Sequence, residues 1–262
     1  MNYPTWSDLN NESVIPPLGA RKAPDIGPVA VMVSCDPDLR LIQSSISSPC
    51  KKPFFISTLI TQAQCDKGVS ITGPFIGAPY AAMILDSLIA KGADTIIMLG
   101  WCGAVSEKCQ VGDILLPTKA IADEGTSKNY KRFDKAPPVS EADQSLVDEL
   151  AQWFHNEKIP ARKAKIWTTD AIYRETEKKI EYYRDLGAVA VEMECSALFS
   201  VAEFRNARIL SVLVVSDNVV SENWEPGFRK KTFKEARLNA CDVILRFADY
   251  LGENGKQHKE RS

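Results

Sequence analysis

The stretch Val191-Glu-Met-Glu-Cys-Ser-Ala-Leu198 decides the fold of this chain, together with the run Ile209-Leu-Ser-Val-Leu-Val-Val-Ser-Asp-Asn218 that follows about one helix length later. The first stretch passes from an extended pattern into a helix, and the second is an apolar run typical of a buried strand. Strand, helix and strand in this order predict an α/β unit, in which polar ligands bind where strands end. Acidic residues stand at these ends, with Glu192 and Glu194 at the mouth of the helix and Asp217 at the end of the later strand.

The same alternation of strands and helices extends in both directions from this unit. Upstream, residues Ala78 to Lys91 have the apolar spacing of a helix, which Gly92 ends. Downstream, residues 230–251 have the pattern of a long closing helix. Further strands are expected at 28–34, 68–72, 94–99, 111–117, 161–167 and 188–191, and further helices at 141–158, 176–186 and 194–205. The pattern predicts an α/β fold in which helices flank the sheet.

The chain is expected to form a single domain over residues 28–251. Residues 1–27 are rich in proline and glycine without periodicity, which predicts an extended N-terminal arm that lies on a neighbouring subunit. Residues 252–262 are polar and are expected to form a flexible tail.

Composition favours a soluble protein that binds small molecules. The chain has 262 residues, of which 45% are hydrophobic, and its formal net charge of −2 gives no basic field for nucleic acid. No apolar run approaches the ~20 residues that span a bilayer, and the N-terminus has no leader pattern. Neither a nucleic-acid nor a membrane partner is therefore expected.

The cysteines do not predict a disulfide framework or a metal site. There are seven, an odd number, and they are scattered without a Cys-x-x-Cys pair beside only two histidines. This pattern favours a reducing, cytoplasmic environment and no bound metal.

Four segments together resemble the nucleoside phosphorylase family, which includes purine nucleoside phosphorylase, uridine phosphorylase and methylthioadenosine nucleosidase. The segments are Cys35-Asp-Pro, Gly100-Trp-Cys-Gly-Ala-Val105 with Val111-Gly-Asp113, Val191-Glu-Met-Glu194 and Ser216-Asp217, and the similarity runs from about residue 28 to 250. The resemblance implies a single-domain, three-layer architecture with a mixed sheet flanked by helices. It also implies an enzyme that cleaves N-glycosidic bonds with inorganic phosphate as co-substrate and no cofactor.

The resemblance assigns the sugar to the Glu-Met-Glu motif. It implies that Glu194 binds the ribose 2′ and 3′ hydroxyls and that Met193 packs on the sugar, with Glu192 as a supporting residue. Carboxylates suit this task because the sugar becomes oxocarbenium-like as the bond breaks. The alternative is that Glu194 only occupies the first turn of a helix, where the helix dipole favours acids.

Asp217 bears on the base that is cleaved. Purine-cleaving members have an aspartate after the serine of this strand, so the resemblance implies that Asp217 is the general acid toward N7. It also implies that Arg229 pairs with this acid. The alternatives are that Asp217 caps a turn and that Arg229 is an unpaired surface residue.

The base is expected to stack on apolar surface. Ile172 and Tyr173 resemble the segment whose phenylalanine stacks on the base, although Ile172 replaces the aromatic ring, and Trp101 is a second candidate. Cys102 and Gly103 belong to the glycine-rich loop, whose backbone can approach a ligand closely. Alternatively, the aromatic residues are ordinary core.

The resemblance is weakest at the phosphate site. Family phosphorylases bring two or three arginines to the dianion, but the positions that correspond to them hold Leu39 and Met98, and Trp101 replaces a hydroxyl. Arg40 is the nearest substitute, with Lys51 and Lys52 as contributors.

Three functions remain open at this stage. The first is phosphorolysis of a purine nucleoside to free base and pentose 1-phosphate, and the second is hydrolysis by a nucleosidase in which Asp36 or Asp38 orients water. The third is a non-catalytic nucleoside-binding protein. In each case the family predicts a homo-oligomer built on dimers, with a hexamer as the expected size.

Overall fold

The computed structural model describes residues 9, 11–47, 49–61, 68–220 and 224–259. Its strands are β1 (Val29–Val33), β2 (Cys50–Phe54), β3 (Ser57–Thr61), β4 (Val69–Gly73), β5 (Thr95–Ala104), β6 (Ile114–Asp123), β7 (Val139–Glu141), β8 (Ala161–Thr169), β9 (Ala190–Glu192), β10 (Arg208–Asn218) and β11 (Glu225–Pro226). Its helices are α1 (Asp36–Ser44), α2 (Ala78–Lys91), α3 (Gln144–Asn156), α4 (Glu177–Asp185), α5 (Cys195–Arg205) and α6 (Lys231–Lys259), with the short 3₁₀ helices η1 (Ser127–Asn129) and η2 (Ile172–Arg174).

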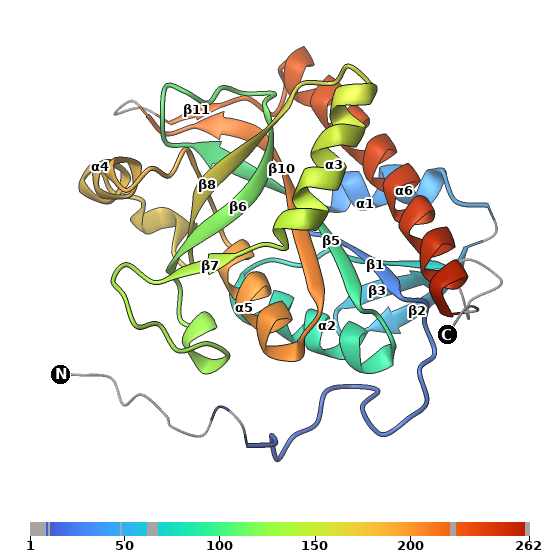
Figure 1. Ribbon diagram of the computed structural model, residues 1–262. Helices are drawn as coiled ribbons and strands as arrows, with labels where there is room; N and C mark the ends of the chain where they lie inside the picture. The colour runs from blue at the N-terminus through green and yellow to red at the C-terminus, as the bar shows by residue number, and fades with distance from the viewer. Residues whose placement is uncertain (1–8, 10, 48, 62–67, 221–223, 260–262) are drawn as a thin grey trace.

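The strands form one mixed sheet (Figure 1), in the order β11-β10-β6-β8-β9-β5-β1-β4-β3-β2 with β7 on β6. β5 runs parallel to β1 and β10, whereas β9 is antiparallel to β5. Because β10 pairs with β5 as well as with β6, the strands β5, β10, β6, β8 and β9 close into a ring. This closure brings the carboxyl ends of β5, β9 and β10 together.

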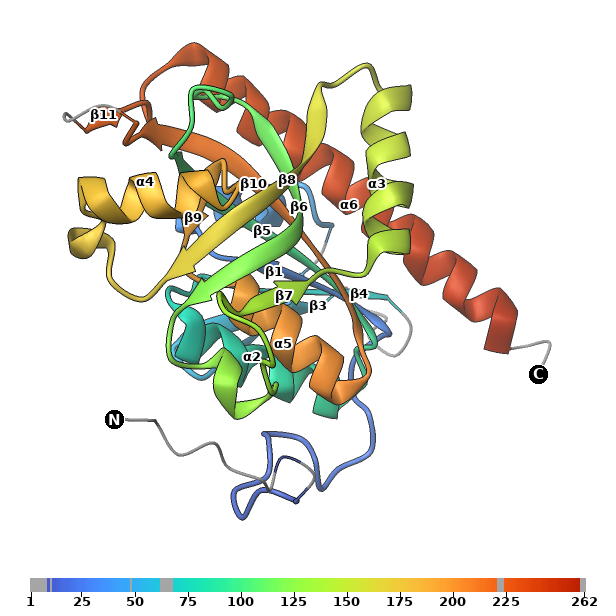
Figure 2. The same cartoon turned by 60° about the vertical axis from the view of Figure 1, so that its left-hand side comes forward.

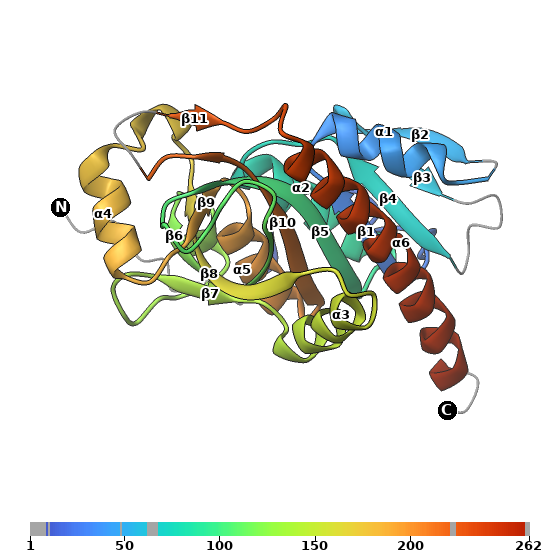
Figure 3. The same ribbon diagram turned by 90° about the horizontal axis from the view of Figure 1, so that it is seen from above.

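Helices cover the sheet on two sides (Figures 2 and 3). α2 and α5 pack against each other on one side, and α1, α3 and α6 lie on the other, where α6 contacts both α1 and α3. The predicted α/β architecture, a mixed sheet flanked by helices in three layers, is confirmed. α4 lies at the margin of the sheet, where Tyr183 stacks on Trp167 of β8 with ring centroids 4.3 Å apart.

The burial of the central strands explains why their apolar pattern was clear in the sequence. All of β10 from Ile209 to Ser216 is buried, and the strand emerges from the core at Asp217. β5 is buried along nearly its whole length beside it. An unbroken apolar run is what a strand covered on both faces requires.

Two segments differ from the sequence-based expectation. The hairpin of β2 and β3 was not predicted, because β2 exposes Lys51, Lys52 and Pro53 at a sheet edge and lacks an apolar pattern. Residues 252–259, predicted to belong to a flexible tail, continue α6 instead. Residues 260–262 of the expected tail lie outside the described residues.

The N-terminal arm contacts its own chain. The backbone N–H of Asp25 donates to the carbonyl of Lys91 at 2.9 Å, and the two side chains form an ion pair at 2.7 Å. The described part of the arm is therefore held at the end of α2, and residues 1–8 lie outside the described part.

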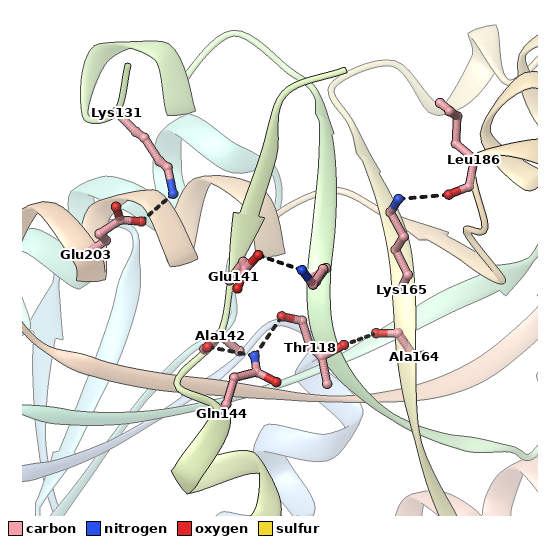
Figure 4. Close-up of polar contacts among 10 residues, drawn as sticks. Thr118, Lys131, Glu141, Ala142, Gln144, Ala164, Lys165, Leu186 and Glu203 are labelled. Carbon is pink, nitrogen blue, oxygen red and sulfur yellow. Dashed lines mark hydrogen bonds and ion pairs between the residues drawn. The ribbon is translucent and has the colours of Figure 1, made fainter. Parts of the chain in front are cut away.

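Polar contacts fix the β6–β7–β8 side of the sheet (Figure 4). Lys119 of β6 pairs with Glu141 of β7 at 2.7 Å, and the Thr118 hydroxyl donates to the carbonyl of Ala164 in β8 at 3.2 Å. Lys165 donates to the carbonyl of Leu186 at 2.8 Å, which holds the segment that enters β9. These contacts set the position of β8, whose end supports the acidic motif.

Within the described ranges, no helix is long and apolar enough to cross a membrane. The described cysteines are all free, and Cys65 lies outside the described residues.

Candidate functional site

Glu192 ends β9 and holds the start of α5. Its Oε2 accepts hydrogen bonds from the backbone N–H groups of Glu194 and Cys195, both at 2.8 Å, and its Oε1 accepts one from the Thr168 hydroxyl of β8. A carboxylate at this point satisfies N–H groups that open the helix and is stabilised by the helix dipole. Glu192 therefore supports the motif from beneath.

Glu194 is buried and is bound by a loop 117 residues away in the chain. The backbone N–H of Gly77, just before α2, donates to its Oε1 at 2.6 Å. Gly77 has φ of 82°, a conformation that other residues rarely adopt, so a side chain here would strain the loop that binds Glu194. Met193 is half-buried between the two glutamates.

Glu192 and Glu194 are buried close together, so a negative charge on one disfavours a negative charge on the other. Burial raises the pKa of both, but Glu192 has three hydrogen-bond donors that favour its charged form. Burial and then the charge of Glu192 raise the pKa of Glu194 to about 8. Hydrogen bonding therefore favours the charged form of Glu192, whereas burial and the neighbouring carboxylate raise the pKa of Glu194 and favour its protonated form.

Asp217 meets this motif across β5. Gly103 of β5 pairs with Val191 of β9 on one side and with Asp217 of β10 on the other. The Ser216 hydroxyl donates to Oδ1 of Asp217, while Oδ2 lies 3.2 Å from the position that a Cβ on Gly103 would take. A glycine is needed here because a side chain would crowd the carboxylate.

Asp217 is bound by Trp224 and not by the expected arginine. The indole Nε1–H of Trp224 donates to Oδ2 of Asp217 at 2.8 Å. Arg229 is exposed, and in the described part of the chain it forms no ion pair with Asp217. The expected pairing of Arg229 with Asp217 is therefore wrong. β11 folds back on β10 by pairing Pro226 with Asp217, which brings Trp224 to the acid and leaves Arg229 beyond the turn.

Glu175, which sequence analysis missed, lies near Asp217 at the end of η2. Burial, and then the charge of Asp217, raise the pKa of Glu175 to about 7, while Lys179 opposes this rise. A carboxyl group with this pKa can hold a proton beside Asp217 at neutral pH. No motif identified it, because its role depends on how η2 folds over β10.

The expected stacking residues are not enclosed. The side chains of Ile172 and Tyr173 in η2 are 53% and 95% exposed. Trp101 is half-buried against Phe233, at 5.0 Å between ring centroids, and against Phe228 at 6.0 Å. Cys102 is buried, and its carbonyl accepts the Ser216 hydroxyl at 3.2 Å.

The first loop, which denotes residues 34–40 from the end of β1 into the first turns of α1, contains a buried ion pair that the sequence did not predict. Asp38 is fully buried, and its Oδ1 accepts from Arg237 of α6 at 2.7 Å (Nε) and 2.6 Å (Nη2). Its Oδ2 accepts from the indole N–H of Trp101 at 2.5 Å, and the guanidinium lies 4.9 Å from the Trp101 ring. Burial raises the pKa of Asp38, and the bonds from Arg237 and Trp101 oppose this rise. Asp38 is therefore enclosed and offers no open oxygen to water.

The remaining residues of the first loop provide little charge for an anion. Arg40 pairs with Asp36 at 2.8 Å on the exposed side of α1, while Leu39 and Met98 are buried. Burial, and then the nearby charges of Asp38 and Glu194, raise the pKa of the Cys35 thiol to about 12. The loop thus lies beside Glu194 and contributes neutral or paired groups.

Among the described residues, no group of three or more His, Cys, Asp or Glu side chains is arranged to hold a metal ion.

Comparison with known proteins gives consistent matches. The profile of the phosphorylase superfamily matches residues 28–249. A DeoD-type purine nucleoside phosphorylase of Brevibacillus brevis is 30% identical over 184 residues, which cover 68% of this chain and 76% of the relative. The crystal structure of Toxoplasma gondii purine nucleoside phosphorylase with immucillin-H superposes with a TM-score of 0.78 at 17% identity, covering 93% of this chain and 99% of that one. An AMP nucleosidase from Bacteroides thetaiotaomicron shares the fold with a TM-score of 0.67 at 21% identity, covering 86% and 92% of the two chains.

Proposed function

This chain belongs to the phosphorylase superfamily, and from that premise we propose that it cleaves the N-glycosidic bond of a purine nucleoside by phosphorolysis. The products are the free base and a pentose 1-phosphate. The enzyme class, that of the nucleoside phosphorylases, is supported by relatives that are purine nucleoside phosphorylases. One observation carries the proposal: β9 and β10 flank β5 at Gly103, so that the strand that leads into the Glu194 motif and the strand that ends in Asp217 both neighbour this residue.

The two acids divide the work of breaking the bond. Glu194 accepts hydrogen bonds from the ribose hydroxyls, which stabilises the positive charge that develops on the sugar. Asp217 delivers a proton to the departing base, so that the C–N bond electrons leave on a neutral heterocycle. An oxygen of phosphate then forms the new bond to the anomeric carbon.

Hydrolysis is the second candidate, and the Asp38–Arg237 pair favours it. Arg237 is the cation that approaches the first loop, but Asp38 already neutralises it within 2.7 Å. A phosphate dianion at this point would meet a compensated pair and apolar Leu39 and Met98. Water carries no charge and needs no such compensation.

Incubation of the purified protein with inosine and with adenosine, each with and without phosphate, tests these reactions. We expect release of free base that requires phosphate and yields a pentose 1-phosphate, both measured by chromatography. Equal release without phosphate would replace phosphorolysis by hydrolysis. Tight nucleoside binding without release under either condition would identify a non-catalytic binding protein.

We also propose that a second copy of the chain covers the loop that binds Glu194. Ile76 is 73% exposed next to Gly77, whose N–H binds Glu194. Ile56, in the β2–β3 turn, is 88% exposed, and its N–H donates to the Tyr80 hydroxyl of α2 at 3.1 Å. Exposed apolar side chains of this size are typical of an interface.

Ile56→Glu is therefore expected to lower the molar mass in solution and to reduce kcat/KM, because a buried charge opposes association. Light scattering after size-exclusion chromatography measures the mass. Leu238→Glu on α6 is the matched control, since Leu238 is an exposed apolar residue on the other side of the sheet. A wild-type protein that is already monomeric at assay concentrations would refute this interface.

A further inference from the structure

Trp224 binds the oxygen of Asp217 that the proposed reaction uses. Oδ1 of Asp217 accepts from Ser216 of the same strand, whereas Oδ2 accepts from the Trp224 indole at 2.8 Å. Gly103 lies against Oδ2 on another side, with 3.2 Å to the position of an added Cβ. The indole therefore occupies the side of Oδ2 that the sheet does not cover.

This contact is not part of the hydrophobic core. The Trp224 side chain is 59% exposed, and its nearest aromatic neighbour is Phe228, with ring centroids 6.2 Å apart. It is held near Asp217 by the two residues of β11, which pair with the end of β10. Little apolar burial opposes displacement of the indole by a ligand.

The indole has the shape and the donor of a protonated purine base. Both are flat bicycles in which a five-membered ring carries an N–H at its edge. A purine that accepts a proton at N7 presents this N–H to a carboxylate, as Trp224 presents Nε1–H to Asp217. A pyrimidine has a single ring and no equivalent edge.

We propose that Trp224 competes with the nucleobase for Oδ2 of Asp217, so that a purine must displace the indole to reach the acid. The inference rests on the proposed function and adds to it a residue that opposes base binding. A purine can take the place of the indole because it matches the bicyclic shape and the N–H. Phe228 then bridges the vacated position to Trp101, at 6.0 Å between ring centroids, and provides aromatic surface along the base.

Titration of the full-length protein with adenine, hypoxanthine and uracil by calorimetry tests this competition. Trp224→Phe keeps a flat ring and removes the N–H, so we expect it to bind both purine bases about three- to tenfold more tightly than the wild type. Trp153→Phe is the matched control, because Trp153 packs on Phe247 and Tyr250 of α6, and its affinities should equal those of the wild type. Uracil should bind weakly to all three proteins.

A second readout follows the indole itself. The difference between the fluorescence spectra of the wild type and Trp224→Phe isolates Trp224, and we expect saturating adenine to shift this difference to longer wavelength as the indole moves into water. Unchanged or weaker purine binding by Trp224→Phe, or a difference spectrum that adenine does not alter, would overturn the inference. Absence of base binding by every variant would overturn it too. The proposed function is tested separately: it fails if the wild type does not cleave nucleosides.

Discussion

Asp217→Asn is expected to lower kcat for inosine by about 10²- to 10⁴-fold, the usual contribution of a general acid, with little change in KM. The carboxyl group lies at the end of β10 with Oδ2 beside Gly103, where the base leaves in the proposed reaction. An amide can still accept a hydrogen bond but has no proton of suitable acidity to transfer. Steady-state kinetics of base release measure both constants.

The choice of leaving group separates the role of an acid from a structural role. A nitrophenyl riboside departs without protonation, so Asp217→Asn should cleave it at nearly the wild-type rate if the fold of the site is intact. Asp134→Asn is the matched control, because Asp134 is an exposed carboxylate paired with Arg132. Equal losses on both substrates, or losses of the same size in kcat and in nucleoside binding, would contradict the assignment of Asp217 as acid.

Above about pH 8, where the Glu194 carboxylate forms, Glu194→Gln is expected to lower kcat/KM by about 10²-fold, which corresponds to two charge-assisted hydrogen bonds at ~1.5 kcal/mol each. The proposed ligands of this carboxylate are the two ribose hydroxyls. The pKa of Glu194 is about 8, so ribose binding should strengthen as the pH rises through this value and the carboxylate forms. A 2′,3′-dideoxynucleoside should bind equally to the wild type and the variant, which is measured by calorimetry.

The same substitution should stabilise the protein at alkaline pH. Folding raises the pKa of Glu194 from 4.5 to about 8, so the native chain keeps a proton that the unfolded chain loses. The free energy of unfolding therefore falls as pH rises from about 4.5 to about 8, and above this the fold contains two buried carboxylates. Glutamine remains neutral, so Tm of Glu194→Gln should exceed that of the wild type by several degrees at pH 9.

This stability difference should vanish at about pH 3.5, below the unfolded-state pKa of 4.5, where the wild-type residue is protonated in both states. Thermal unfolding followed by circular dichroism at the two pH values measures it. Glu203→Gln is the matched control on the same helix, because Glu203 is exposed and pairs with Lys131 (Figure 4). If Glu194→Gln is less stable than the wild type at pH 9, the prediction is contradicted, because the Glu194 carboxylate would then stabilise the native state.

Much of the fold could be predicted from local pattern. The apolar run that became β10 and the helical spacing that became α2 were unambiguous, because each is buried by neighbours along most of its length. The β2–β3 hairpin was missed because its edge strand is exposed and polar. The last turns of α6 were missed because they lack an apolar face, so no periodicity marked them.

The candidate site was predicted in part. The motif around Glu194 and Asp217 was located by residue type and by position at strand ends, and the register of β5 brings both to Gly103. The partners of these residues were not predicted. Arg237 reaches Asp38 across 199 residues of chain, and Trp224 takes the place expected for Arg229.

By itself, the sequence determined the order of strands and helices and the acidic residues at their ends, because burial leaves a periodic trace in a local stretch of chain. Only the tertiary structure decided which groups face these acids, since a hydrogen bond or ion pair depends on distance and not on separation along the chain. Gly77 beside Glu194, Trp224 on Asp217 and Arg237 on Asp38 follow from ring closure of the sheet and from the packing of α6. These contacts set the charge and the access of the site, and they direct the chemistry that we propose.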